Sequence, residues 1–450
     1  MIAFDTAMNW LEGLQKFGIK PGLERMEWML EKLSHPERRL KFVHIAGTNG
    51  KGSTVAFLTS VLREAGYEIG TYTSPAMGNV TNRIQWNGKD IPDDQFANFI
   101  ERLIPLAEEL ERTEWGPLTE FETTTLIAIL YFAEEVFPDL VIWETGLGGL
   151  NDCTNVVVPI VSAITNIGFD HTQILGETKR EIAMQKAGII KNGFPTITTE
   201  EDPEALEVIE TTAVRKKSPI YRLNKDFRIV RKSTDPDKQI EMLDFYSPYT
   251  DYHDLQIPLL GEHQVKNAGL AIMVLLVMRE FYAVYFESED LLEGLKKTIW
   301  PGRFEIIKED PLLILDGAHN LEGIEALSKV LSERFAHQKP RLLFAALEDK
   351  DVQGMIQRLS TVVSQVIVTK AEHPRATELE NLEMWFRDAN SQLEILPIED
   401  WRKAVSTWQS EAAKGDILLA TGSLYFISDL RKELGGKQAA CFDLKEGTGE

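Results

Sequence analysis

Residues 44–54 read HIAGTNGKGST, and they directly follow the apolar stretch that contains Leu40, Phe42 and Val43. A glycine-rich turn with one lysine, placed between an apolar strand and the helix-forming stretch VAFLTSVLREAG (55–66), is the context that a phosphate-binding loop needs. Glycines let the backbone curl so that several N–H groups face one anion, and a helix N-terminus adds positive charge. We therefore predict that the nucleotide phosphates are bound by Gly47, Thr48, Asn49, Gly50, Lys51, Gly52, Ser53 and Thr54.

This loop departs from the common formula G-x-x-x-x-G-K-[ST]. Ile45 stands where the first glycine is expected, and Gly52 stands where a hydroxyl residue is expected. The hydroxyl of Ser53 or Thr54 could instead ligate Mg²⁺, because Gly52 has no side chain. An ordinary strand-to-helix turn is the alternative, and the density of glycine, lysine and hydroxyl residues disfavours it.

Composition restricts the possible functions. A chain of 450 residues exceeds one typical core, so two or three domains are expected. The net charge of -22 disfavours binding to nucleic acid or to an anionic membrane. Two cysteines exclude a disulfide framework, and the N-terminal stretch has the pattern of an amphipathic helix rather than of a signal peptide. No apolar run has the length of a membrane span, so we expect a cytoplasmic protein.

Apolar strands alternate with helix-period segments along most of the chain, which predicts an α/β fold with mainly parallel sheets. We predict a P-loop domain over residues 1–298 and a smaller, Rossmann-like α/β domain over residues 299–436, with a mobile tail over 437–450. Alternating polar and apolar residues between about 200 and 260 predict a small strand-rich excursion. The strands expected are 42–45, 140–143, 160–165, 312–315, 342–345, 363–368, 394–397 and 417–420, and the clearest helices are 320–335 and 376–389.

Polar residues follow several of these strands. Glu144 ends one apolar strand, and a carboxylate there can hold Mg²⁺ beside nucleotide phosphates. Asp170 and His171 follow the next strand, where an isolated histidine is more often structural than functional. Lys186, in EIAMQKAGIIK (181–191), has the pattern of a lysine on a solvated helix face.

Taken together, these segments resemble one family. The short loop GTNGKGS with Gly52 is similar to that of the folylpolyglutamate synthase and dihydrofolate synthase branch of the Mur-ligase superfamily. Further matches follow in order and run to about residue 426: WETGLGGLNDCTN, TNIGFDHTQILG, EIAMQKAGIIK, GEHQVKNAGLA, PGRFE, ILDGAHN, LEDKD and ATGSLYF.

The resemblance implies roles for individual residues. It assigns the metal to Ser74, Glu144 and His171, and contacts with ATP to Asn267, Arg303, Asp316 and His319. It also implies that Lys186 is carbamylated, which turns a cation into an anion. The catalytic residues expected on this basis are Lys51, Lys186, His171 and Arg303.

Two segments differ from the family pattern. SPAM (74–77) stands where the family usually has SPHL, and GLGGLNDCTN (146–155) stands where it often has GLGGRLDATN. Asn82 replaces an acid beside the arginine of a further motif. Candidate contacts with the pterin-bearing substrate are Arg83, Phe121 and Asp152, although an aromatic residue such as Phe121 is more often part of a core.

The family resemblance implies an ATP-dependent ligase that adds L-glutamate to folate through an acyl phosphate, with ATP and Mg²⁺. Dihydropteroate is a second substrate to consider, and we expect a monomer. One alternative is another Mur-type ligase that attaches an amino acid to a UDP-linked muramyl substrate. A P-loop ATPase without ligase activity is a further alternative, but it would have no need of Lys186, Arg303 or the turn with Asp316 and His319.

Overall fold

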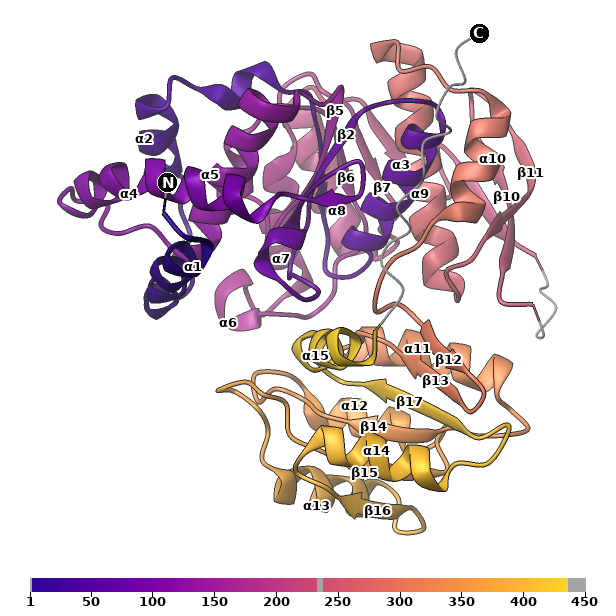
Figure 1. Cartoon of the computed structure of the whole chain (residues 1–450). Coiled ribbons are helices and arrows are strands. Elements are labelled where there is room, and N and C mark those ends of the chain that lie inside the picture. Colours follow the sequence, from indigo (N-terminus) through magenta and orange to yellow (C-terminus); the bar gives the residue numbers. More distant parts are fainter. Residues whose placement is uncertain (1, 233–237, 436–450) are drawn as a thin grey trace, which may run out of the picture. The chain divides into compact units, whose positions relative to one another are not determined.

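The computed structural model describes residues 2–232 and 238–435. The predicted tail over 437–450 lies outside these residues. The described chain forms two compact units (Figure 1). The N-terminal unit comprises residues 2–232, 241–257 and 263–298, and the C-terminal unit comprises 238–240, 258–262 and 299–435.

The N-terminal unit is built on an eight-stranded sheet in the order β4-β3-β2-β5-β1-β6-β7-β8. Neighbouring strands from β2 to β8 in this order pair parallel, and the pairs β2–β3 and β3–β4 are antiparallel. The strands are β1 Phe42–Ala46, β2 Ile69–Tyr72, β3 Ile84–Trp86, β4 Lys89–Asp90, β5 Leu140–Glu144, β6 Pro159–Ile164, β7 Thr196–Thr198 and β8 Ile220–Arg222.

The central strands carry the features that place the site. β1 and β5 are buried at every position, as expected for parallel strands covered on both faces. Ile45 of β1 pairs with Glu144 of β5, and Ala46 pairs with Ile164 of β6. The segments that leave these three strands therefore lie together at one edge of the sheet, where open α/β sheets bind ligands.

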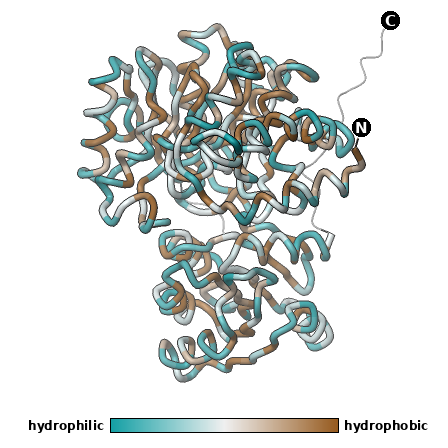
Figure 2. The backbone as a smooth tube through the Cα atoms, turned by 90° about the vertical axis from the view of Figure 1, so that its left-hand side faces the viewer, coloured by the Kyte–Doolittle hydropathy of each residue, from teal (hydrophilic) through white to brown (hydrophobic). Residues whose placement is uncertain are grey.

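Helices cover both faces of this sheet (Figure 1). One face carries α1 Phe4–Gly13, α2 Glu24–Lys32, α4 Asp93–Glu111 and α5 Glu120–Tyr131, which share a core with Phe42, Tyr72 and Trp143. The other carries α3 Lys51–Glu64, α9 Glu262–Tyr282 and α10 Ser288–Lys297, and the last strands are accompanied by α6 Thr172–Leu175, α7 Lys179–Lys186 and α8 Pro203–Arg215. In Figure 2, which colours the chain by residue hydropathy, hydrophobic residues are concentrated in the interior of each unit, and hydrophilic residues are frequent on the outer helices.

The strand-rich excursion predicted between about 200 and 260 is confirmed as a small antiparallel sheet in the order β11-β10-β9. Its strands are β9 Arg228–Arg231, β10 Glu241–Tyr246 and β11 Tyr252–Ile257. It packs on α9, because a Cβ at Gly269 would lie 2.0 Å from the Ile229 side chain.

The C-terminal unit is a second α/β layer structure with a six-stranded sheet in the order β12-β13-β17-β14-β15-β16. Only the edge strand β12 is antiparallel to its neighbour. The strands are β12 Glu305–Glu309, β13 Leu312–Leu315, β14 Arg341–Phe344, β15 Gln365–Val368, β16 Glu394–Pro397 and β17 Ile417–Thr421. The helices are α11 Leu321–Arg334, α12 Val352–Leu359, α13 Leu379–Ala389, α14 Trp401–Glu411 and α15 Leu424–Leu434.

The α/β class of both units is thus confirmed, and element ends differ where pairing across the sheet decides them. The strand predicted from residue 363 begins at Gln365, which pairs with the first residue of β14, Arg341. The helix predicted from residue 376 begins at Leu379. Ala376 instead forms a bridge with Leu347, and that long-range contact is invisible in local periodicity. Among the described helices, none is long and apolar enough to cross a membrane.

Candidate nucleotide site

The turn after β1 requires glycine at two positions. Gly47 has φ +152° and Gly50 has φ +86°, a region of backbone conformation that side chains disfavour. A Cβ at Gly47 would lie 1.7 Å from Thr165 Oγ1, and one at Gly50 would lie 2.3 Å from Asn267 Oδ1. The chain therefore passes too close to its neighbours for any larger residue. Asn267, predicted to contact ATP, lies on α9 against the turn.

Residues that follow β6 hold the turn in place. The N–H of Thr48 donates to the carbonyl of Asn166 (2.9 Å), and the N–H of Asn49 donates to Asn166 Oδ1 (2.9 Å). Thr165 Oγ1 donates to the carbonyl of Asn49 (2.6 Å). The sequence interpretation missed Thr165 and Asn166 as parts of the site, although both lie in the segment TNIGFDHTQILG that the family resemblance includes.

The donors for a phosphate are consequently those at the start of α3. The N–H groups of Thr48 and Asn49 are engaged by Asn166, whereas the first N–H groups of a helix have no acceptor within the helix. α3 begins at Lys51, with Gly50 as its N-cap. The geometry thus fits an anion at the helix N-terminus.

Lys51 folds back over the turn. Its Nζ donates to the carbonyls of Gly47 (3.0 Å) and Thr48 (3.3 Å) and lies 3.9 Å from Glu144 Oε1. Ser53 and Thr54 are both buried, and Thr54 Oγ1 donates to the carbonyl of Gly50 (3.0 Å). The first turn of α3 therefore places one ammonium beside a buried carboxylate and carries two buried hydroxyl residues.

The candidate Mg²⁺ site centres on Glu144. The N–H of Ser74 donates to Glu144 Oε2 (3.3 Å), which brings Ser74, on the turn after β2, next to the end of β5. Among the residues the structure describes, no group of three or more histidine, cysteine, aspartate or glutamate side chains could hold a metal ion. Mg²⁺ is commonly held by one or two protein carboxylates together with waters and substrate phosphates, so this oxygen donor set fits it.

His171, the third predicted metal residue, lies at the start of α6 with φ 49°. Its Nε2 lies 3.8 Å from Asp170 Oδ1, and its N–H donates to the same oxygen (2.9 Å). Its side chain remains 35% exposed, which keeps it accessible to a ligand.

The burial of Lys186 differs from the solvent-exposed position that its sequence pattern indicates. It ends α7 and is only 3% exposed, so it does not lie on a solvated face. The glycine-rich turn after β5 packs directly against this helix end, since a Cβ at Gly149 would lie 2.9 Å from the Lys186 carbonyl oxygen. Local helical periodicity could not predict this burial, because the covering turn is distant in sequence.

Of the three residues proposed to contact the pterin-bearing substrate, Arg83 and Phe121 lie close to each other, whereas Asp152 binds backbone N–H groups. Arg83 Nη1 donates to Glu120 (2.8 Å), and its Cζ lies 5.9 Å from the centre of the Phe121 ring. Asp152 is buried and accepts the N–H groups of Leu147 (2.7 Å) and Thr154 (3.0 Å). Burial raises the pKa of Asp152, and these hydrogen bonds oppose the rise. Asp152 thus holds the turn after β5.

In the C-terminal unit, the turn after β13 brings Arg303, Asp316 and His319 together. Asp316 accepts the N–H groups of Phe304 and Ala318 (both 2.9 Å). Burial raises the pKa of the Asp316 carboxyl. The charge of Arg303 and the two hydrogen bonds oppose this rise. His319 Nδ1 lies 2.8 Å from the carbonyl oxygen of Gly317, and a Cβ at Gly317 would lie 2.2 Å from Arg303 Nη1.

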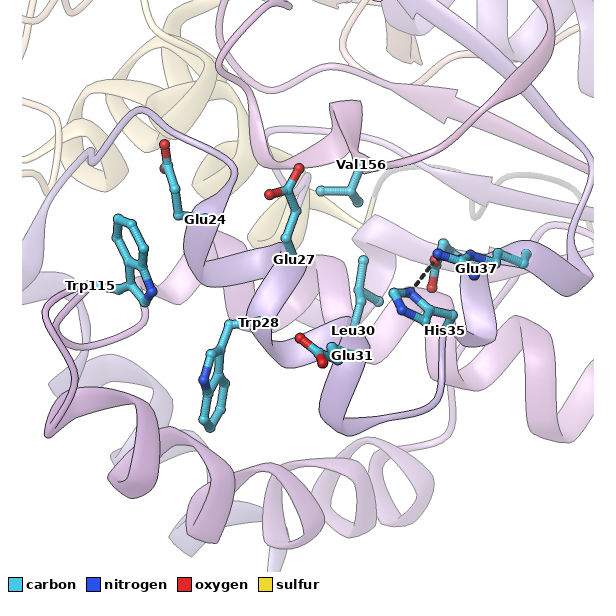
Figure 3. A pocket seen from close by; sticks show the side chains of 10 residues that line it. Glu24, Glu27, Trp28, Leu30, Glu31, His35, Glu37, Trp115 and Val156 are labelled. Atoms are coloured by element: carbon cyan, nitrogen blue, oxygen red, sulfur yellow. Dashed lines mark hydrogen bonds and ion pairs between the residues drawn. The ribbon is translucent and has the colours of Figure 1, made fainter.

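A separate pocket of about 480 Å³ lies along α2 in the N-terminal unit (Figure 3). Its acidic residues would repel a nucleotide, and it contains none of the predicted site residues. The lining residues are Glu24, Glu27, Trp28, Leu30, Glu31, His35, Glu37, Arg38, Trp115 and Val156.

A glycine-rich turn at the carboxyl edge of a parallel sheet, with a lysine near a buried carboxylate, is typical of an α/β enzyme that uses a nucleoside triphosphate. Residues 45–275 match the Mur ligase middle domain, and residues 302–424 match the Mur ligase glutamate ligase domain. The chain belongs to the folylpolyglutamate synthase/dihydrofolate synthase family of Mur ligases, which are ATP-dependent ligases.

Individual relatives cover almost the whole chain. The dihydrofolate synthase/folylpolyglutamate synthase of Bacillus subtilis is 43% identical over 96% of this chain and 99% of its own. A Mycobacterium tuberculosis folylpolyglutamate synthase complexed with ADP and AMPPCP is 27% identical over 96% of this chain and 99% of that one, with a TM-score of 0.88. The protein in an FPGS–AMPPCP–folate complex is 28% identical over 97% of this chain and 100% of that one, with a TM-score of 0.82.

Proposed function

We propose that this protein joins the amino group of L-glutamate to a carboxylate of folate, using ATP. The observation that carries this proposal is the pair formed by Lys51 and Glu144, 3.9 Å apart at the end of parallel strands. The full-length similarity to a dihydrofolate synthase/folylpolyglutamate synthase supports folate as the acceptor. The complex of a related protein with AMPPCP and folate supports the same two substrates.

The reaction has two steps. A carboxylate is a poor electrophile, so the γ-phosphoryl group of ATP is first transferred to a carboxylate oxygen of folate, which gives an acyl phosphate and ADP. The amine of L-glutamate then attacks the acyl carbon, loses a proton and displaces inorganic phosphate. Catalysis consists mainly of holding the reactants in line and of neutralising the negative charge on the transferred group.

The chain's own groups supply these effects. The N-terminus of α3 and Lys51 receive the phosphates, and Lys51 exchanges its bonds to the turn for bonds to the nucleotide. Glu144 and Ser74, with Ser53 and His171, would hold Mg²⁺, which when bound supplies positive charge to the phosphate oxygens. Asn267, Arg303, Asp316 and His319 contact ATP in this proposal, and the planar guanidinium of Arg303 suits bidentate binding of phosphate.

Carbamylation of Lys186 is part of the same proposal. Burial disfavours the charged amine, and a carbamate forms only from the neutral amine. The resulting anion would help to organise the metal and the substrate. Activity that falls when carbon dioxide is removed and returns with bicarbonate would support this modification.

The proposal also includes the predicted domain organisation and setting of the protein. Residues 1–298 form the ATP-binding domain and residues 299–436 form the C-terminal ligase domain. The protein acts as a cytoplasmic monomer, as expected from its sequence. Arg83 and Phe121 contact the pterin-bearing substrate, while Asp152 supports the neighbouring turn.

Dihydropteroate is a second acceptor to test, because the Bacillus subtilis relative carries both activities in its name. ADP release from purified protein should require ATP, Mg²⁺, L-glutamate and either folate or dihydropteroate. Release with a UDP-linked muramyl acceptor and no folate would favour the other Mur-type reaction. Release from ATP alone, at the same rate as with all substrates, would favour an ATPase without ligation.

A further inference from the structure

Two of the sequence departures contact each other in the structure. Met77 belongs to SPAM, and Asn82 replaces the family's acid five residues later. The N–H of Met77 donates to Asn82 Oδ1 (3.1 Å), and Asn82 Nδ2 donates to the carbonyl of Met77 (2.5 Å). The side-chain amide of Asn82 thus forms a hydrogen-bonded ring with the backbone N–H and carbonyl of a single residue, Met77. We refer to these two bonds as the Asn82 clasp.

The amide of Asn82 suits both bonds of the clasp. It must accept one hydrogen bond and donate another, and an ionised carboxylate can only accept. The amide lies in ordinary contact with the turn, since a Cβ at Gly78 would lie 3.4 Å from Asn82 Nδ2, and Gly78 has φ +115°. The replacement of an acid by Asn82 therefore matches the backbone that it contacts.

The clasp bears on the metal-binding edge of the sheet through Ser74. The segment is closed at its base, where the N–H of Thr73 donates to the carbonyl of Arg83 (3.0 Å), and nearer its tip by the clasp. Ser74 lies between these two closures, and its N–H donates to Glu144 Oε2 (3.3 Å). Two closures restrict how far Ser74 can move from Glu144.

We propose that Asn82 is a positioning residue that holds Ser74 at Glu144 and thereby sets the affinity of this edge for a divalent cation. It acts through the loop and does not contact the substrates. This inference rests on the proposed role of Ser74 and Glu144, and it adds to that role a residue that differs from the family pattern.

The test is Asn82→Asp, which keeps the size of the side chain and removes the donor. Asn79→Asp is the matched control, because Asn79 is exposed on the same loop and its side chain makes no cap hydrogen bond. ADP affinity is measured by calorimetry with Mg²⁺ and again with EDTA. In Asn82→Asp the gain in affinity due to Mg²⁺ should fall about five-fold, the size expected for one lost hydrogen bond, with affinity in EDTA unchanged.

Asn82→Ala, which removes both bonds without adding charge, should reduce the gain at least as much. Equal Mg²⁺ gains in Asn82→Asp and Asn79→Asp would overturn the inference. Unfolding of both Asn82 variants would also overturn it, because it would assign the clasp to overall stability. If the wild type instead binds Mg²⁺·ADP but ligates no glutamate to folate or dihydropteroate, the proposed function fails and the clasp stands.

Discussion

At the scale of single residues, Lys51 is the cation of the proposed phosphate-binding turn after β1. Its ammonium is bonded to two carbonyl oxygens of its own turn and lies near one buried carboxylate. These contacts hold the Lys51 ammonium against the turn, and 15% of the Lys51 side chain remains exposed to solvent. An arriving phosphate offers stronger, charge-assisted hydrogen bonds than the carbonyls do.

Replacement of Lys51 by alanine should therefore lower kcat by about 100-fold or more, the scale reported for loss of one group that stabilises developing charge. The melting temperature should change little, since Lys51 Nζ lies 3.9 Å from Glu144, beyond hydrogen-bond distance, and Glu144 still accepts the N–H of Ser74. Steady-state ADP release and thermal unfolding test both expectations. Lys41→Ala, at an exposed position before β1, is the control. A kcat within three-fold of the wild type would contradict the role of Lys51.

Gly47→Ala should distort the turn, because the new Cβ would lie 1.7 Å from Thr165 Oγ1 in a strained backbone region. We expect a loss of about 1–3 kcal/mol in the free energy of unfolding and weaker ADP binding. Gly13→Ala is a suitable comparison, since its Cβ meets nothing within 4 Å. Urea unfolding and ADP titration provide the measurements. Equal stability of the two variants would show that the turn tolerates a side chain.

At the scale of elements, α2 and α5 are joined by a buried ion pair. Arg25 Nε donates to Glu122 Oε1 (2.8 Å), with 9% and 3% of the two side chains exposed. The other Glu122 oxygen accepts the N–H (2.8 Å) and hydroxyl (2.9 Å) of Thr119, which caps α5. The same pair therefore fixes the start of the helix that presents Phe121.

Arg25→Met should leave Glu122 buried without its partner and cost about 3–5 kcal/mol of unfolding free energy. Arg102→Ala breaks an exposed pair with Glu134, with side chains 47% and 28% exposed, and should cost at most about 1 kcal/mol. Urea unfolding curves distinguish the two. Similar losses in both variants would mean that burial does not govern the contribution of the Arg25 pair.

β1 also carries a pH-sensitive group. His44 is fully buried, and its Nε2 lies 3.1 Å from Thr154 Oγ1. Burial, aided by Lys191, lowers the pKa of His44 from 6.5 to about 3. Because the folded-state pKa is below the unfolded one, stability is retained above about pH 6.5 and is lost as the pH falls towards 3.

Between pH 7 and 5, His44 should account for about 2 kcal/mol of lost stability. His44→Met removes this titration, so its unfolding free energy should depend less on pH over that range. Chemical denaturation at several pH values measures the difference. A variant with the same pH dependence as the wild type would exclude His44 as the source.

At the scale of the whole molecule, the parallel sheets could be predicted because their strands are continuous apolar runs that end in polar turns. The glycine-rich turn between β1 and α3 could be predicted because its glycines and lysine are adjacent in sequence. Asn166 and the burial of Lys186 could not, since each depends on which segments become neighbours across the sheet. The family resemblance supplied Arg303 and His319, whose roles no local pattern indicates.

The central claim is that the chain transfers phosphate energy into an amide bond between folate and glutamate. The most direct measurement is the mass of the folate product after incubation with ATP, Mg²⁺ and L-glutamate. A gain of one or more glutamyl residues, absent without ATP and strongly reduced in Lys51→Ala, is the predicted result. Unchanged masses of both folate and dihydropteroate, while ATP is still hydrolysed, would contradict the claim.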